Sequence, residues 1–280
     1  MHLKSFITTI GLLALSDSLV AAERALNFVA HQDDDLLFIN AEIIHDIDLG
    51  NEVRTVFLTA GDAGLGADYW TNRQAGTMAA YAEMAGVSND WEESDVGVPD
   101  KDIPLYTLRD RSEISIAFMH IPDGNNDGSG FASTGNESME KLWKGAIGAI
   151  GTVDASGTTY TRDELIETLT WVIDDYSPDF TNALNYIDDF GSVGDHSDHT
   201  SSALFANQAA IESDFPGDVI GYIGYDSQNL PANLSPEDLQ KKKDAFYAYG
   251  AYDVSAACAD DASCAGTEYE LWLQREYPRN

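Results

Sequence analysis

Two short motifs rich in histidine and aspartate are the residues of this chain best suited to chemistry. The first is His-Gln-Asp-Asp at 31–34, directly after the apolar run 26–30, and the second is His-Ser-Asp-His at 196–199. Zinc binds imidazole and carboxylate ligands in proteins. Acids that are buried side by side also need a positive charge among them. The sequence therefore predicts a divalent metal site built from both motifs.

Each motif also has a purely structural interpretation. Histidine and aspartate at the start of a helix can cap it, because carboxylates there interact favourably with the helix dipole. The second motif opens the helical pattern at 203–212, and His196 and His199 are three residues apart, which places them on one face of a helix. Three of the six histidines fall in these two motifs, so a metal site is the better interpretation.

The elements that position these motifs alternate along the chain. Strand patterns occur at 26–30, 54–59, 103–108, 114–121, 180–185 and 219–225, and helix patterns at 35–49, 72–85, 161–176, 203–212 and 235–249. Thr161 and Glu164 have the spacing of a capping box. This alternation predicts a layered α/β fold with a mainly parallel sheet. Both motifs then follow strands, at the carboxyl ends where open sheets bind their ligands.

In this order and separation, the two motifs resemble those of the zinc-dependent de-N-acetylases of the PIG-L, or LmbE-like, family. The family's first motif is usually Ala-His-Pro-Asp-Asp-Glu and its second is His-x-x-His. The resemblance continues through Thr-Ala-Gly-Asp-Ala-Gly at 59–64, Arg73 and Gly86-Val87, and it covers most of the chain after residue 22. It implies a three-layer Rossmann-like fold with a mainly parallel sheet.

The resemblance also implies a role for each motif residue. His31, Asp34 and His199 would bind zinc, or another divalent transition metal, and leave one position for water. A metal of this kind lowers the pKa of its water to roughly 7. Asp33 would not be a ligand and would act as the general base on that water. His196 would then stabilise the oxyanion or assist proton transfer.

Other positions are open to two interpretations. Asp198 would fix the tautomer of His196, or it is an ordinary acid at the start of a helix. Arg73 would contact the substrate by family resemblance, or it is a surface charge. Gln32 replaces the usual proline of the first motif and Asp35 replaces the usual glutamate.

Composition and the N-terminus bear on partners and location. The net charge of −33 and the pI near 4.1 argue against nucleic acid or anionic lipid as a partner. Residues 1–22 combine a basic start, an apolar segment and small residues, which is typical of a signal peptide. The alternative is a membrane anchor, which needs about 20 apolar residues. The strongly apolar segment here, from Phe6 to Leu15, is only about half that length. We therefore expect a secreted chain with one domain, 23–280.

Four smaller features of the sequence bear on its chemistry and its environment. Cys258 and Cys264 are the only cysteines and are expected to form a disulfide in an oxidising compartment. Asn136 and Asn233 begin glycosylation sequons, which a eukaryotic host would use. Residues 123–129 are spaced like half of a calcium loop, but the twelfth position is not an acid, so a surface turn is favoured. The aromatic residues that could stack on sugars are Tyr69, Trp70 and Trp143.

The function predicted from the residues and the resemblance is that of a secreted, zinc-dependent hydrolase that removes N-acetyl groups from N-acetylglucosamine-type amino sugars. One alternative is an N-acetylglucosaminyl-phosphatidylinositol de-N-acetylase that acts at a membrane. Another is a carbohydrate-binding protein without catalytic activity.

Overall fold

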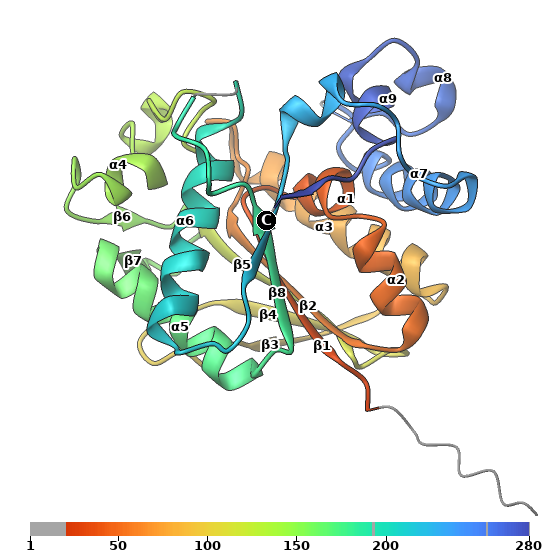
Figure 1. Cartoon of the computed structure of the whole chain (residues 1–280). Helices are drawn as coiled ribbons and strands as arrows, with labels where there is room; N and C mark the ends of the chain where they lie inside the picture. Colours follow the sequence, from red (N-terminus) through yellow and green to blue (C-terminus); the bar gives the residue numbers. More distant parts are fainter. Residues whose placement is uncertain (1–20, 192–193, 256, 280) are drawn as a thin grey trace, which may run out of the picture.

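The computed structural model describes residues 21–191, 194–255 and 257–279 (Figure 1). The predicted signal peptide, 1–22, lies almost wholly outside these ranges. Within them, eight strands form one sheet in the order β10-β9-β8-β1-β2-β5-β4-β3. The strands are β1 (Arg24–Val29), β2 (Glu52–Thr59), β3 (Trp91–Asp95), β4 (Pro104–Leu108), β5 (Ile114–Ile121), β8 (Phe180–Leu184), β9 (Val219–Tyr222) and β10 (Pro278–Arg279).

The centre of the sheet is parallel and buried. Strands β9, β8, β1, β2 and β5 run in one direction, whereas β3, β4 and β10 pair antiparallel at the two edges. All eight residues of β5 and five of the six in β1 are buried, as expected when helices cover both faces. The outermost strand β3 carries exposed acids, which oppose pairing with another chain at this edge.

Helices cover both faces of the sheet, which gives the predicted three layers (Figure 1). Helices α1, α2, α3 and α7 lie on one face, and α5 and α6 lie on the other. Their bounds are α1 (Asp34–Phe38), α2 (Glu42–Leu49), α3 (Ala67–Ala85), α5 (Arg162–Tyr176), α6 (Ser197–Glu212) and α7 (Pro236–Gly250). Shorter elements are η1 (Ala132–Thr134), α4 (Met139–Trp143), η2 (Tyr225–Asn229), α8 (Asp261–Cys264), α9 (Glu268–Trp272) and the hairpin β6 (Ile150–Gly151) with β7 (Thr159–Tyr160).

The α/β fold with a mainly parallel sheet is confirmed, and several boundaries differ from the prediction. The helix expected after the first motif is two helices, α1 and α2, separated at 39–41. Asn40 lies fully buried in this break, and its side-chain amide donates to Met84 Sδ. The capping box at Thr161 and Glu164 is present. Across the described residues, no helix is both long and apolar enough to span a membrane.

The C-terminal region packs against α1 and contains a disulfide. Cys258 and Cys264 are bonded, as predicted. The fully buried Lys242 of α7 donates to the carbonyl oxygens of Leu37 and Arg275, both at 2.7 Å. The lysine thereby joins α7, α1 and the C-terminal segment, next to the first motif.

Candidate metal centre

The topology brings the two motifs together at one edge of the sheet. His31 follows β1 and Asp34 begins α1, whereas His199 lies in the first turn of α6, after β8. Strands β1 and β8 are parallel neighbours, so the segments that leave their carboxyl ends meet. The chain thus places the motifs side by side although they are far apart in sequence.

His31, Asp34 and His199 form a compact, buried group. One ligand atom from each lies within 4.8 Å of the others. Asp34 Oδ1 is 2.9 Å from His199 Nε2, and Asp34 Oδ2 is 3.2 Å from His31 Nδ1. Ligand atoms that bind one tetrahedral zinc at about 2.0 Å are about 3.3 Å apart. The two distances from Asp34 to the histidines are therefore close to those that a single bound cation requires.

Two further carboxylates hold the histidine rings of this group. Asp195 Oδ1 lies 2.8 Å from His199 Nδ1, and Asp198 Oδ2 lies 3.3 Å from His31 Nε2. A carboxylate can only accept in such a contact, so each ring carries its proton on that nitrogen. The opposite nitrogens, His199 Nε2 and His31 Nδ1, face the two carboxylate oxygens of Asp34. A metal bound between them would displace any proton from these nitrogens, and Asp195 and Asp198 would then orient the two rings as ligands.

The electrostatics of the group favour a positive charge. Burial alone would lower the pKa of His199, but Asp34 and Asp195 outweigh it and raise the pKa to about 10. The pKa of His31 is likewise raised well above its usual value, because Asp34, Asp198 and Asp123 outweigh the effect of burial. Among the described residues, buried His199 Nε2 has no hydrogen-bond partner. These residues therefore fit a divalent cation.

Asp33 lies beside the group and is held by Arg73. Its Oδ1 accepts a 2.8 Å hydrogen bond from Arg73 Nη2. Burial raises the pKa of Asp33 to about 6, and the guanidinium of Arg73 opposes this rise. Arg73 is itself buried. Its Nη1 donates to the carbonyl of Gly61 and its Nε donates to the hydroxyl of Tyr249, both at 2.8 Å. Asp253 Oδ2 lies 3.2 Å from the same Nε. Arg73 is not a surface charge; it orients Asp33.

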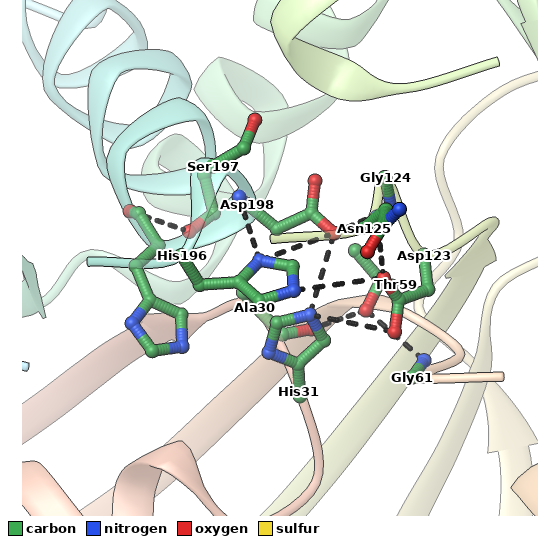
Figure 2. A network of polar contacts seen from close by, with 12 residues as sticks. Ala30, His31, Thr59, Gly61, Asp123, Gly124, Asn125, His196, Ser197 and Asp198 are labelled. Carbon is green, nitrogen blue, oxygen red and sulfur yellow. Dashed lines mark hydrogen bonds and ion pairs between the residues drawn. The ribbon is translucent and has the colours of Figure 1, made fainter. Parts of the chain in front are cut away.

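A second buried group shares His31 and contains Asp123, His196 and Asp198 (Figure 2). His196 Nε2 lies 3.7 Å from Asp123 Oδ1. His196 caps α6, and its Nδ1 accepts from the backbone N–H of Asp198 at 3.1 Å. Nδ1 is therefore unprotonated and Nε2 carries the proton.

The expected contact between the Asp198 carboxylate and His196 needs correction. Asp198 Oδ2 is 3.9 Å from His196 Nδ1, but it accepts from the backbone N–H of Gly124 at 2.7 Å and lies closer to His31. The reason is the helix cap: the backbone amide of Asp198 already occupies Nδ1. The carboxylate thus belongs to His31, and the backbone sets the tautomer of His196.

Sequence reasoning assigned no site role to two acids that the structure places here. Asp195 precedes the second motif, and its only signal was its position next to His196. Asp123 was considered only as part of a calcium loop; it lies just after the strand β5, and position after a strand was its available signal. Gln32, in place of the usual proline, donates from Nε2 to the carbonyl of Thr59 at 3.0 Å and so ties the motif to β2.

Two hollows open onto the group. One, of about 220 Å³, is lined by His31, Asp33, Ala63, Tyr69, Arg73, Asp123, Asn125, Asn126, Phe131, His196, Tyr225 and Tyr269. The other, of about 330 Å³, is lined by Asp33, Asp34, Leu37, Asn126, Tyr225, Thr267, Glu268, Tyr269 and Trp272. They share Asp33, Asn126, Tyr225 and Tyr269. We call them together the metal-side pocket, and a ligand that enters it meets Asp33 and His196.

Comparison with known proteins gives a family match and structures of similar fold. Residues 26–210 match the family model described as PIG-L: GlcNAc-PI de-N-acetylase. No curated protein matches the chain. An N,N'-diacetylchitobiose deacetylase from Pyrococcus horikoshii is similar in structure, with a TM-score of 0.51, 15% identity, and coverage of 90% of this chain and 76% of that one.

Two other solved structures are less similar. A 4-carboxy-2-hydroxymuconate hydratase from Pseudomonas putida has a TM-score of 0.46 and 16% identity over 89% of this chain and 81% of that one. A zinc-inhibited form of a teicoplanin deacetylase also has a TM-score of 0.46 and 16% identity, over 90% of both chains. The family match spans most of the chain and includes both motifs. The chain therefore belongs to the PIG-L family of GlcNAc-PI de-N-acetylases.

Proposed function

We propose that this chain is a secreted, zinc-dependent hydrolase that removes the N-acetyl group from N-acetylglucosamine-type amino sugars. The observation that carries the proposal is the buried group of His31, Asp34 and His199 with the carboxylate of Asp33 beside it, at the wall of a pocket. Membership of the PIG-L family supports the reaction. The substrate class is supported by the diacetylchitobiose deacetylase of similar fold.

The reaction needs an activated water and a proton for the leaving amine. A zinc ion held by His31, Asp34 and His199 would supply Lewis acidity toward water and the amide carbonyl. Asp33 is the residue placed to take a proton from the attacking water and to deliver it to the amine nitrogen. Its hydrogen bond from Arg73 fixes the direction of the carboxylate, and the two residues line the same pocket.

His196 is placed to act on the oxygen of the amide. With Nδ1 bound to the backbone of α6, the ring presents its Nε2–H. A neutral donor in this position stabilises the negative charge that develops on the carbonyl oxygen. Burial and the neighbouring His31 and His199 lower the pKa of His196 well below its usual value, which keeps the ring neutral and its donor fixed.

Secretion is part of the proposal and is supported by two observations. The N-terminal 22 residues have a signal-peptide pattern. The disulfide between Cys258 and Cys264 is typical of proteins that fold in an oxidising compartment.

The test is acetate release from N-acetylglucosamine oligomers by the purified secreted protein, before and after removal of metal by a chelator. We expect release to stop with the chelator and to return with zinc. Asp33→Asn should lower turnover by at least about 100-fold and leave bound zinc unchanged. Asp46→Asn, a buried acid on α2 bonded to Asn51, is the matched control and should keep full activity.

Other results would identify the alternatives. Release only from a N-acetylglucosaminyl-phosphatidylinositol lipid, by protein found in the membrane fraction, would indicate the glycolipid enzyme. Sugar binding without release, unchanged in Asp33→Asn, would indicate a binding protein. Release that persists without metal would overturn the proposed mechanism.

A further inference from the structure

A third hollow, of about 530 Å³, lies next to the metal-side pocket and has no part in the mechanism above. Its size is within the range of small-molecule sites. It lies between the first turn of α3, the end of β5, the segment around η1 and strand β6. The side chains that matter here are Asp62, Trp70, Ser133, Glu137 and Thr152. We call it the Trp70 hollow.

The Trp70 hollow and the metal-side pocket are neighbours, because adjacent residues of the chain line one or the other. Asp62 lines the hollow and its neighbour Ala63 lines the pocket; the same holds for Trp70 and Tyr69. The turn at 63–65 packs on Phe131: a Cβ added to Gly64 would lie 2.7 Å from the ring of Phe131. The two cavities are therefore close enough neighbours for a ligand made of linked units to be considered for both.

Trp70 is a supported aromatic surface. Its ring is partly exposed and packs on the ring of His120, with centroids 4.7 Å apart. His120 is fixed in turn by Asp154 at 3.0 Å and Gln74 at 3.1 Å. By contrast, Trp143, the other tryptophan considered for sugar stacking, packs edge-on against Phe205 and lies under the guanidinium of Arg162. Of these two tryptophans, Trp70 is thus the one that lines a cavity.

The charged groups of the hollow are carboxylates only. Asp62 accepts from the backbone N–H groups of Asp123 and Gly64, and Glu137 Oε2 accepts from that of Gly151 at 3.2 Å. Within the described part of the chain, neither acid forms an ion pair with a basic side chain, and no basic residue lines the hollow. The hollow is therefore suited to a ligand with hydroxyl groups and one positive charge.

From these observations we propose that the Trp70 hollow binds the sugar unit next to the one being deacetylated, and favours a unit whose amine is already free and protonated. The ring of this glucosamine unit stacks on Trp70, which also attracts the ammonium group. Glu137 and Asp62 balance its charge. This inference rests on the proposed function and narrows its substrate to oligomers, including partly deacetylated ones.

The experiment compares wild type, Trp70→Ala and Glu137→Gln on N-acetylglucosamine monomer, on the fully acetylated tetramer and on a partly deacetylated tetramer. Trp70→Ala should raise KM for both tetramers about tenfold and leave the monomer unchanged. Glu137→Gln should raise KM about fivefold for the partly deacetylated tetramer alone. Trp91→Ala, on the edge strand β3, is the control for loss of a tryptophan elsewhere.

A second measurement makes the result independent of turnover. Calorimetry with a glucosamine tetramer should show about tenfold weaker binding to Trp70→Ala than to wild type. Equal binding to both proteins, or an equal rise in KM for monomer and tetramers, would overturn the inference. If wild type releases no acetate from any sugar, the proposed function fails, and the calorimetric comparison still decides whether the hollow binds amino sugars.

Discussion

Asp195 provides the sharpest test of the metal centre, because it contacts a proposed ligand without being one. Its Oδ1 receives three N–H groups: from the His199 ring at 2.8 Å, from the backbone of His196 at 3.0 Å and from that of Tyr225 at 3.2 Å. The approach of η2 is possible because Gly224 lacks a side chain: a Cβ there would lie 2.5 Å from the carboxylate. Asp195 should therefore set both the direction and the basicity of His199.

The expected loss of zinc affinity depends on which contacts of Asp195 each variant keeps. Asp195→Asn retains an oxygen that can accept all three N–H groups and loses only the charge, so we expect about tenfold weaker zinc binding, or about 1.4 kcal/mol. Asp195→Ala removes the acceptor as well and leaves the His199 ring free to turn. We expect about 100-fold weaker binding, or about 3 kcal/mol.

Zinc affinity of the metal-free proteins can be measured by competition with a coloured chelator, and the visible absorption of bound cobalt reports ligand geometry. Asp46→Asn, on α2 and bonded to Asn51, is not among the residues that line the metal-side pocket and should match wild type. If both Asp195 variants bind zinc as tightly as wild type, then Asp195 does not position a ligand and His199 is not held as we describe. If wild type itself binds no divalent metal, the assignment of the centre is wrong.

Three further predictions concern stability. Burial raises the pKa of Asp46 to about 6, so the folded state favours the neutral carboxyl group. The contribution of this group to the free energy of unfolding is therefore present in full below about pH 4 and is lost as the pH rises through 6. Asp46→Asn should therefore gain about 1 to 2 kcal/mol in urea unfolding at pH 7 and nothing at pH 4; the same gain at both pH values would contradict this. Replacing Cys258 and Cys264 by serine should cost about 2 kcal/mol, the value for so short a loop, and an unchanged urea midpoint would show that the bond adds nothing. Gly76→Ala places a Cβ 2.8 Å from the ring of Tyr249, so it should lower stability by about 1 to 3 kcal/mol; a melting temperature equal to wild type would exclude close packing of α3 on α7.

Much of the fold was predictable because the central strands carry strong local signals. Strand β5 matches its prediction at both ends, since its eight buried residues form one apolar run. The edge strand β3 was missed because Trp-Glu-Glu-Ser-Asp has neither an apolar run nor alternation; only its pairing with β4 makes it a strand. Strand β10 consists of two residues and depends wholly on β9.

The candidate site, like the fold, could be predicted only in part. His31, Asp34 and His199 could be named from their motifs, and the structure brings them together. Whether they bind zinc stays a prediction. The carboxylates beside the two histidines, Asp195 and Asp198, lie at the second motif, but the partners of Arg73 could not be named, because they come from segments with no local signal. Arg73 reaches Tyr249 and Asp253, which lie some 180 residues away in sequence. Such contacts depend on how α3 and α7 pack, and no pattern within either helix specifies that.

The contribution of the C-terminal region to the pocket has a consequence for how specificity is encoded. The family match ends at residue 210, but Tyr225, Tyr269 and Trp272 line the metal-side pocket and Tyr249 steadies Arg73. The walls of the pocket thus come from both sides of residue 210, whereas the residues of the two motifs all precede it. Exchanging the stretch after residue 210 between relatives should therefore change one part of the pocket wall and leave both motifs as they are, so relatives that share the motifs can diverge in what they accept.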